Sequence, residues 1–469
     1  HKMRWRMFDK NTNLKYTYQE IWDTHTTIIE ILIELFDYDE NKFSQLLNEV
    51  TKLSHKDRNR VLTWADEVCL KVDQKSFTTW AIIRKMLNHH RSHPDTDWAL
   101  PESELKRLEN LYNKLQPAST LEKYIWLFND HWPEFPEGFV YKDNEFEKRH
   151  DQQQKRVDDA RKDAVVNFIS ELGLDKTIEL RNEISQLWAF GYALADVISK
   201  QEDIFTISKC LYDEESKITF VHSFIYRKSI KEGFDWVKVL FSDLQKKGYS
   251  HQALSNVLIP INQNQELWDF ISTLNEEIQN LYWQNVRPHF YHISDAEKVF
   301  GVEVLLTHKR FFSAIDIASH FPTNLLSKML RKAGTEESSE TTRFNGYEIE
   351  RIFEELDNRE DIEKSTLIHL EWIYLPILDS YGTRRNPINL EEELTNNPEF
   401  FIDVLKWIYI PKDKTLLEEE RKGITDEVVQ SRAKQSYHLL NSWKKIPGMK
   451  DDNSIDELEL KSWIEKVRE

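Results

Sequence analysis

The stretch Ala193-Leu-Ala-Asp-Val-Ile198 recurs twice downstream in this chain of 469 residues, as Ala253-Leu-Ser-Asn-Val-Leu258 and Ser313-Ala-Ile-Asp-Ile-Ala318. The copies follow one another at a spacing of 60 residues and share one polar residue in register, which is Asp196, Asn256 or Asp316. All three copies fall between Ile178 and Phe344. A fixed period in this range is typical of stacked helical repeats, because one helical unit cannot bury its apolar face without a neighbour.

A second set of landmarks keeps the same spacing. Leu180, Leu240 and Phe300 are each followed three places later by an acid and then by an apolar residue. The alternative is a series of unrelated helices of similar length, which would give chance matches at this spacing. Both interpretations predict an all-α protein.

Composition agrees with long helices. The chain contains only 11 Gly and 13 Pro, fewer turn residues than a sheet-rich protein normally needs. Hydrophobic residues make up 40%, which is enough to bury a core and excludes global disorder. We therefore predict an all-α fold, an α-solenoid of stacked helical hairpins of the HEAT or TPR type, without a significant β-sheet.

The net charge and the number of cysteines indicate which kinds of partner the protein binds and in which cellular compartment it lies. The formal net charge of -18 argues against general nucleic-acid binding, because phosphate attraction needs a positive surface. The two cysteines, Cys69 and Cys210, cannot build a disulfide framework and have no Cys or His neighbour at metal-ligand spacing. We expect a cytoplasmic protein without cofactors, for which nucleic acid is an unlikely partner.

The start of the chain predicts neither secretion nor a membrane partner. His1–Phe8 is basic but leads into polar residues rather than the apolar core of a signal peptide. The apolar run Ile28–Phe36 is interrupted by Glu30 and Glu34, and no run of about 18 apolar residues occurs elsewhere. Because the chain lacks an initiator Met, we expect a fragment of a longer protein.

Four regions are predicted along the chain. Residues 1–125 form an N-terminal helical region, and residues 126–177 a connector rich in aromatics and proline, followed by a long charged helix. Pro133 and Pro136 forbid a helix through the connector. Residues 178–345 form the repeat array, which ends in a polar loop from Gly334 to Gly346. Residues 346–469 form a C-terminal helical region and cap, whose last helices are more polar.

Several helix ends are predicted from capping residues. Ser54 precedes a helix and has an acid three residues later, as in a capping box. Gly173 is placed to end the long helix that begins near Glu145. Asn397 and Pro398 open another helix, whereas Pro376 is expected to interrupt the helix that begins at Ser365.

The densest cluster of possible metal ligands is His89, His90, His93, Asp95 and Asp97. Adjacent His89 and His90 would project about 100° apart on a helix. No further HxxxH or Cys pair completes a ligand set, so a solvated helix end is the preferred interpretation and no metal is predicted. A small helical metal-dependent hydrolase is the alternative that this cluster would support.

Other enzyme signatures are weak or absent. His150-Asp151 matches the dipeptide of helical metal-dependent phosphohydrolases, but it lies in a charged run typical of an exposed face. The sequence has no GxxxxGK[ST], GxGxxG, HExxH or GxSxG motif. We therefore predict no catalytic, cofactor-binding or metal-binding residue.

Arg384 and Arg385, between Tyr381 and Asn386, are the candidate binding residues, because a guanidinium can grip a carboxylate or a phosphate. The alternative is a surface loop that neutralises the acidic residues Glu391–Glu393. The 15 tryptophans are mostly assigned to the core, including Trp372 and Trp407, which lie in apolar helical patterns.

Several phrases resemble those of a known class of proteins: Asp97-Trp-Ala-Leu-Pro101, Trp126-Leu-Phe with its Pro136-Glu-Gly138 ending, Leu370-Glu-Trp-Ile-Tyr-Leu-Pro376 and Asn397-Pro-Glu-Phe-Phe401. They are similar to the C-terminal helical regions of large bacterial STAND-type proteins, in which a sirtuin-like or nuclease effector and an NTPase core precede a helical-repeat sensor. The resemblance implies a sensor in antiphage defence that binds a partner and relays this binding to the NTPase.

These observations predict a non-catalytic region that recognises a protein through an extended surface. The partner would be phage-derived or another domain of the same parent chain, and any NTPase or effector activity would lie outside this chain. A nucleic-acid-binding α-solenoid is the other alternative, and it would need a continuous basic stripe.

Overall fold

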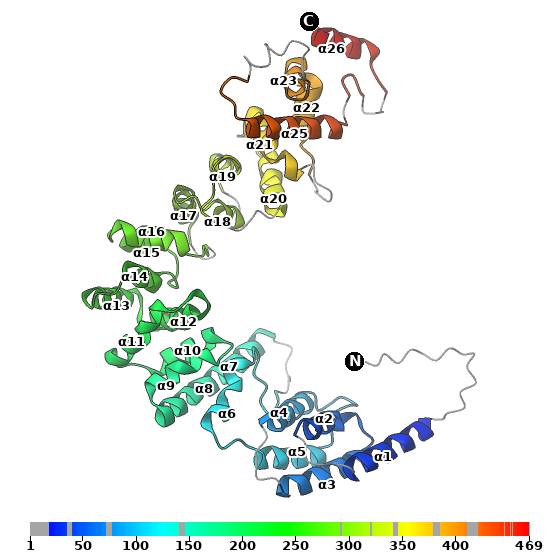
Figure 1. The fold of residues 1–469 in the computed structure, drawn as a ribbon, viewed down its shortest axis with the longest axis vertical. Helices are drawn as coiled ribbons and strands as arrows, with labels where there is room; N and C mark the ends of the chain where they lie inside the picture. The colour runs from blue at the N-terminus through cyan, green and yellow to red at the C-terminus, as the bar shows by residue number, and fades with distance from the viewer. Residues whose placement is uncertain are drawn as a thin grey trace. The chain divides into compact units, whose positions relative to one another are not determined.

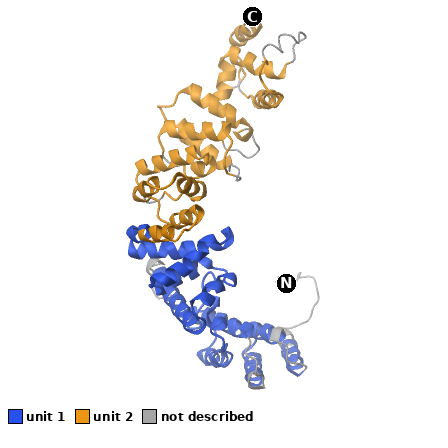
Figure 2. Ribbon diagram, turned by 60° about the vertical axis from the view of Figure 1, so that its left-hand side comes forward, with its two compact units in different colours: residues 1–238 blue, residues 239–469 orange. Residues whose placement is uncertain are grey.

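A computed structural model describes residues 18–468 apart from 35–39, 72–76, 140–145, 291–292, 319–320, 341–345, 379–384, 410–420, 445, 451 and 453. The chain divides into two compact units, His1–Lys238 and Val239–Glu469 (Figure 2). The division falls inside the predicted repeat array and follows none of the predicted boundaries, and the four predicted regions stay a prediction.

The first unit is built from helices, shown in Figure 1. They are α1 (Tyr18–Glu34), α2 (Glu40–Glu49), α3 (His55–Lys71), α4 (Phe77–Ser92), α5 (Glu102–Lys114), α6 (Thr120–Tyr124), α7 (Trp126–Asn129), α8 (Phe146–Leu172), α9 (Leu174–Glu179), α10 (Leu187–Val197), α11 (Gln201–Ser208) and α12 (Glu215–Glu232). Short 3-10 helices are η1 (Val50–Lys52), η2 (Leu180–Asn182) and η3 (Lys209–Tyr212).

The second unit is also helical. Its helices are α13 (Phe234–Lys246), which contains the division, α14 (His251–Leu258), α15 (Gln265–Ser272), α16 (Glu276–Asn285), α17 (Asp295–Thr307), α18 (Phe311–Asp316), α19 (Thr323–Thr335), α20 (Gly346–Asp357), α21 (Lys364–Leu378), α22 (Ile388–Asn396), α23 (Pro398–Ile408), α25 (Asp426–Ser442) and α26 (Glu457–Arg468). Among the described residues there is no strand, only an isolated antiparallel bridge between Met449 and Ile455. The predicted all-α class is confirmed.

Alternate helices pack on one another within each unit. In the first unit α1 contacts α3, α2 contacts α4, α3 contacts α5 and α10 contacts α12. In the second unit the corresponding pairs are α14 with α16, α17 with α19, α18 with α20 and α19 with α21. This local pattern is the one that stacked helical hairpins produce. The solenoid as a whole stays a prediction.

Some helix boundaries keep the spacing of the predicted repeat. Leu174, Phe234 and Asp295 begin α9, α13 and α17, and His251 and Phe311 begin α14 and α18. The helix with the first copy departs from this spacing, because α10 begins at Leu187, and the repeat stays a prediction. Side-chain burial follows the period less well. Leu180 and Leu240 are buried, whereas Phe300 is 41% exposed, because Val302 and Leu305 supply the buried face of α17.

The predicted caps are present. Ser54 Oγ accepts the Asp57 N–H at 3.2 Å, and Asn397 Oδ1 accepts the N–H groups of Glu399 and Phe400. Gly173 follows α8 with a φ of 77°, the left-handed conformation that favours glycine after a helix. These helix ends are decided by local hydrogen bonding, which is why the sequence predicts them.

Two connections differ from expectation. The polar loop begins later than Gly334, because α19 continues to Thr335. Its residue Glu340 has a structural task, since its carboxylate accepts the N–H groups of Phe312 and Ser313 at the start of α18. In the connector, Phe128 is buried as expected, but Trp132 is 48% exposed and contacts the His150 ring.

Candidate functional site

A groove of about 390 Å³ opens in the second unit, and we call it the aromatic groove. It is formed by α21, α22, α23 and α25. Its walls are largely apolar, with a few charged groups at the edge. The lining residues are Ser365, Ile368, His369, Trp372, Leu390, Phe400, Asp403, Val404, Trp407 and Arg432.

Helical periodicity explains why these side chains share one surface. On α23, Phe400, Val404 and Trp407 follow the spacing of one helix face, and Ile368 and Trp372 do so on α21. Val404 is 2% exposed and belongs to the core cluster. Trp372 and Phe400 pack on that cluster while remaining partly exposed. The groove is therefore a place where the core of the second unit reaches the surface.

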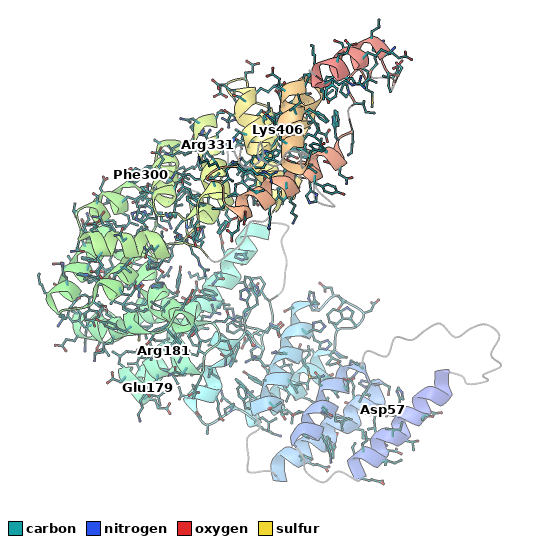
Figure 3. All side chains as sticks on the ribbon, turned by 45° about the horizontal axis from the view of Figure 1, so that its top comes forward. Asp57, Glu179, Arg181, Phe300, Arg331 and Lys406 are labelled. Carbon is teal, nitrogen blue, oxygen red and sulfur yellow. The ribbon has the colours of Figure 1, made fainter. Side chains whose placement is uncertain are left out.

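Arginines mark the edge of the groove at Trp407. The guanidinium carbon of Arg432 lies 4.7 Å from the centroid of the Trp407 ring, and that of Arg421 lies 5.7 Å from it. Arg421 also donates to the carbonyl of Lys406 at 3.4 Å; Lys406 is labelled on α23 in Figure 3. Within the described part of the chain, Arg432 has no carboxylate partner. Among the described residues, the indole therefore lies beside a guanidinium that makes no ion pair.

Arg385, one of the two predicted binding residues, is buried next to the groove. Its guanidinium makes two hydrogen bonds to the Asp357 carboxylate, at 2.6 and 2.8 Å, and one of 2.5 Å to Glu371. Burial disfavours the charge, but the bonds and charges of Asp357 and Glu371 raise the pKa of Arg385 above its ordinary value. Because these donors bond groups of the same chain, Arg385 has a structural role here. The alternative prediction, that it neutralises Glu391–Glu393, differs from the structure, in which its partners are Asp357 and Glu371. Arg384 lies outside the described residues.

Glu371 connects Arg385 to a residue of the aromatic groove by hydrogen bonds. Its side chain is fully buried, and its carboxylate accepts the main-chain N–H of Leu390 at 2.8 Å and the side-chain amide of Asn389 at 2.8 Å. Leu390 lines the groove. Arg385 and Glu371 therefore hold the start of α22 against α21 and fix one wall of the site.

The histidine cluster forms an aromatic contact group around Trp98. The rings of His89, His90 and His93 lie 4.5, 5.6 and 5.5 Å from the Trp98 ring. His90 Nδ1 accepts the N–H of Leu100, and burial together with the charges of His89 and Arg58 lowers the pKa of His90 to about 4.

No metal site is found in the part of the chain that the structure describes. None of its His, Cys, Asp and Glu residues form a group of three that could hold a metal ion. Asp95 and Asp97 are exposed beside the histidines. His150 and Asp151 are exposed on α8, as their charged surroundings predicted.

The polar residues of the repeat have separate tasks. Asp196 pairs with Arg227 and Lys231, whereas Asn256 accepts a bond from Gln252. Burial and the nearby charges of Glu348 and Glu340 raise the pKa of Asp316. These three positions therefore do not supply one repeated chemical function.

The sequence did not reveal the aromatic groove. Trp372 and Trp407 were assigned to the core, yet both are half-buried and line the groove. An apolar helical pattern is the same for a core residue and for a groove residue, and only the position of the neighbouring helix separates them.

No helix in the described part of the chain is long and apolar enough to cross a membrane. Comparisons with family models, with curated proteins and with solved structures found no match to this chain.

Proposed function

We propose that this chain is a non-catalytic recognition region that binds a segment of a protein partner in the aromatic groove. The observation that supports the proposal is the exposed edge of Trp407 beside Arg432, a guanidinium without a carboxylate partner among the described residues. Tryptophan and arginine are the residues that most often dominate protein interfaces. Apolar grooves between helices commonly accept an amphipathic segment.

The chemistry of the groove describes the segment that would bind. Trp372, Phe400 and Trp407 offer an apolar surface from which a large apolar side chain would displace water. Arg432 would pair with an acidic side chain one helical turn away from that anchor. The predicted partner is an amphipathic helix that carries Asp or Glu next to an apolar face.

Panning a displayed peptide library on the purified chain tests this proposal. Enriched peptides should combine apolar anchors with an acid, and their affinity should fall about 30-fold or more for Trp407→Ala, because truncating a dominant contact costs about 2 kcal/mol or more. Tyr409→Ala is the matched control, since Tyr409 is 59% exposed, follows α23 and does not line the groove. Peptides that bind both variants equally, or no enrichment over an unrelated helical protein, would refute the proposal.

A role of this recognition in antiviral defence rests on the sequence resemblance alone. Affinity capture with the intact parent protein during phage challenge tests that role. Recovery of a phage protein by the unaltered chain but not by Trp407→Ala would support it, and equal recovery by both would count against it.

A further inference from the structure

A second groove of about 710 Å³ lies in the second unit between α19 and the connection from α20 to α21, and we call it the polar groove. Its α19 wall includes Ser327, Lys328, Arg331 and Lys332. Thr366 of α21 lines it, whereas the neighbouring residue Ser365 lines the aromatic groove. The two grooves therefore lie on different sides of the start of α21.

Arg331 is the cation in this groove that has no acidic partner among the described residues (Figure 3 labels it on α19). Lys332 pairs with Glu336 at 3.0 Å, and Lys328 lies 3.6 Å from Glu303. The side chain of Arg331 is exposed and has no ion pair within the described part of the chain. An unpaired guanidinium in the wall of a groove is a candidate anion site, because its planar fork of N–H donors matches a carboxylate.

The opposite wall is held in place by hydrogen bonds. Thr323 Oγ1 donates to Asp361 at 2.6 Å and accepts from Arg359 at 3.2 Å, and Arg359 also pairs with Glu355. Because these groups already bond one another, the wall keeps its shape before a ligand arrives. A preformed groove loses less conformational entropy on binding than one that must be ordered.

The charges of the groove favour a polypeptide over a nucleic acid. Glu336, Asp361 and Glu363 line it together with the cations, and these carboxylates would repel successive phosphates. Nucleic-acid binding relies on a continuous series of cations, which the groove lacks. A polypeptide can instead place a single carboxylate on Arg331 and offer main-chain N–H groups to the carboxylates of the groove.

We propose that the polar groove binds a polar segment of a protein that carries a single Asp or Glu, with that carboxylate held by the Arg331 guanidinium. The inference stands on different residues from the aromatic groove and does not rest on the function proposed for that groove. The two grooves can belong to one partner or to two.

Carbodiimide cross-linking tests the inference, because this reagent joins a bound carboxylate to an adjacent amine. The probe is a synthetic peptide with one Glu among Ser residues, and the same peptide with Gln in place of Glu is the uncharged control. Mass spectrometry of the cross-linked full chain should place the Glu peptide mainly on Lys328 and Lys332, the amines on either side of Arg331. Arg331→Gln should lower this yield about tenfold, as expected for loss of a charge-assisted hydrogen bond.

Matched variants separate the possible outcomes. Arg287→Gln makes the same charge change at an exposed arginine of the second unit that does not line the groove, and it should leave the yield unchanged. Trp407→Ala should also leave it unchanged, so a failure of the aromatic groove would be distinguishable. Cross-links spread over the exposed lysines, or a yield that Arg331→Gln does not alter, would overturn the proposal. Displacement of the peptide by poly-uridine at equal charge concentration would also overturn it, in favour of nucleic-acid binding.

Discussion

The side-chain amide of Gln435 on α25 donates a hydrogen bond of 3.2 Å to the main-chain carbonyl of Trp372 on α21. That carbonyl would normally accept the N–H of residue 376, but Pro376 has none. The sequence predicts that Pro376 interrupts the helix, yet α21 continues to Leu378. Gln435 supplies the missing donor, and the same bond fixes α25 beside a wall of the aromatic groove.

A double-mutant cycle between Gln435 and Pro376 measures how much the Gln435 amide compensates for the N–H that Pro376 lacks. Gln435→Ala should lower stability by about 1 kcal/mol, because the Trp372 carbonyl then has no donor. In a Pro376→Ala background the same change should cost much less, since the alanine restores the helical N–H at this position. Thermal unfolding and hydrogen exchange of α21 amides report both effects. Equal costs in the two backgrounds would show that the bond does not compensate for the proline.

Breaking the buried Arg385–Glu371 pair should strongly destabilise the second unit. Arg385→Met would leave the fully buried Glu371 without its cation, and removing one partner of a buried pair typically costs about 3 to 5 kcal/mol. Hydrogen exchange at the start of α22 should accelerate first, because Glu371 accepts the Leu390 N–H. Arg287→Gln, at an exposed arginine, is the control and should leave both the free energy of unfolding and the hydrogen exchange of α22 unchanged.

His90 should make the first unit less stable in acid. Its folded pKa of about 4 lies below the ordinary value of 6.5, so between these values the unfolded chain binds a proton that the folded chain does not. The contribution of His90 is therefore fully present above pH 6.5 and declines as the pH falls toward 4. We expect a loss of about 2 to 3 kcal/mol over this range, in excess of that of a His90→Gln variant.

Denaturant unfolding at pH 7 and pH 4.5 measures this difference. His93→Gln is the matched control, because His93 is exposed and its ring contacts the same indole. A wild-type protein with the same pH dependence as His90→Gln would show that the buried ring does not cause the effect.

Gly191 should not tolerate a side chain. A Cβ at this position would lie 2.2 Å from the Phe220 carbonyl oxygen, so α10 and α12 would have to separate. We expect Gly191→Ala to cost about 2 to 3 kcal/mol despite the better helix propensity of alanine. Gly346→Ala is the control, because its Cβ would meet only Ile377 at an ordinary contact distance of 3.4 Å. Equal melting temperatures for the two variants would contradict the close approach of the helices.

The helical fold class and many helix ends could be predicted because their causes are local. Ser54, Gly173 and Asn397 act on main-chain groups within a few residues, and such bonds can be recognised from spacing alone. The spacing of 60 residues also recurs between the starts of α9 and α13 and between those of α14 and α18. Phe300 departs from it because burial depends on the neighbours that a helix meets.

The candidate sites could not be predicted in the same way. The sequence singles out Arg385 as a binding residue, but its partners are Asp357 and Glu371, which lie on two different helices of the chain. Trp407 could not be separated from a core residue until α21 and α25 were placed beside it. Nothing in the sequence distinguishes Arg331 from Lys328 and Lys332. Only the structure shows that both lysines have an acidic partner, whereas Arg331 has none among the described residues.

The sequence by itself determined that this chain is helical and where several of its helices begin and end. Those features follow from hydrogen bonds and apolar periodicity over a few turns. Only the tertiary structure decided which tryptophans line a groove, which arginines are neutralised and which proline is accommodated. These outcomes depend on groups that are distant along the chain, and nothing in the local sequence specifies which of them will meet.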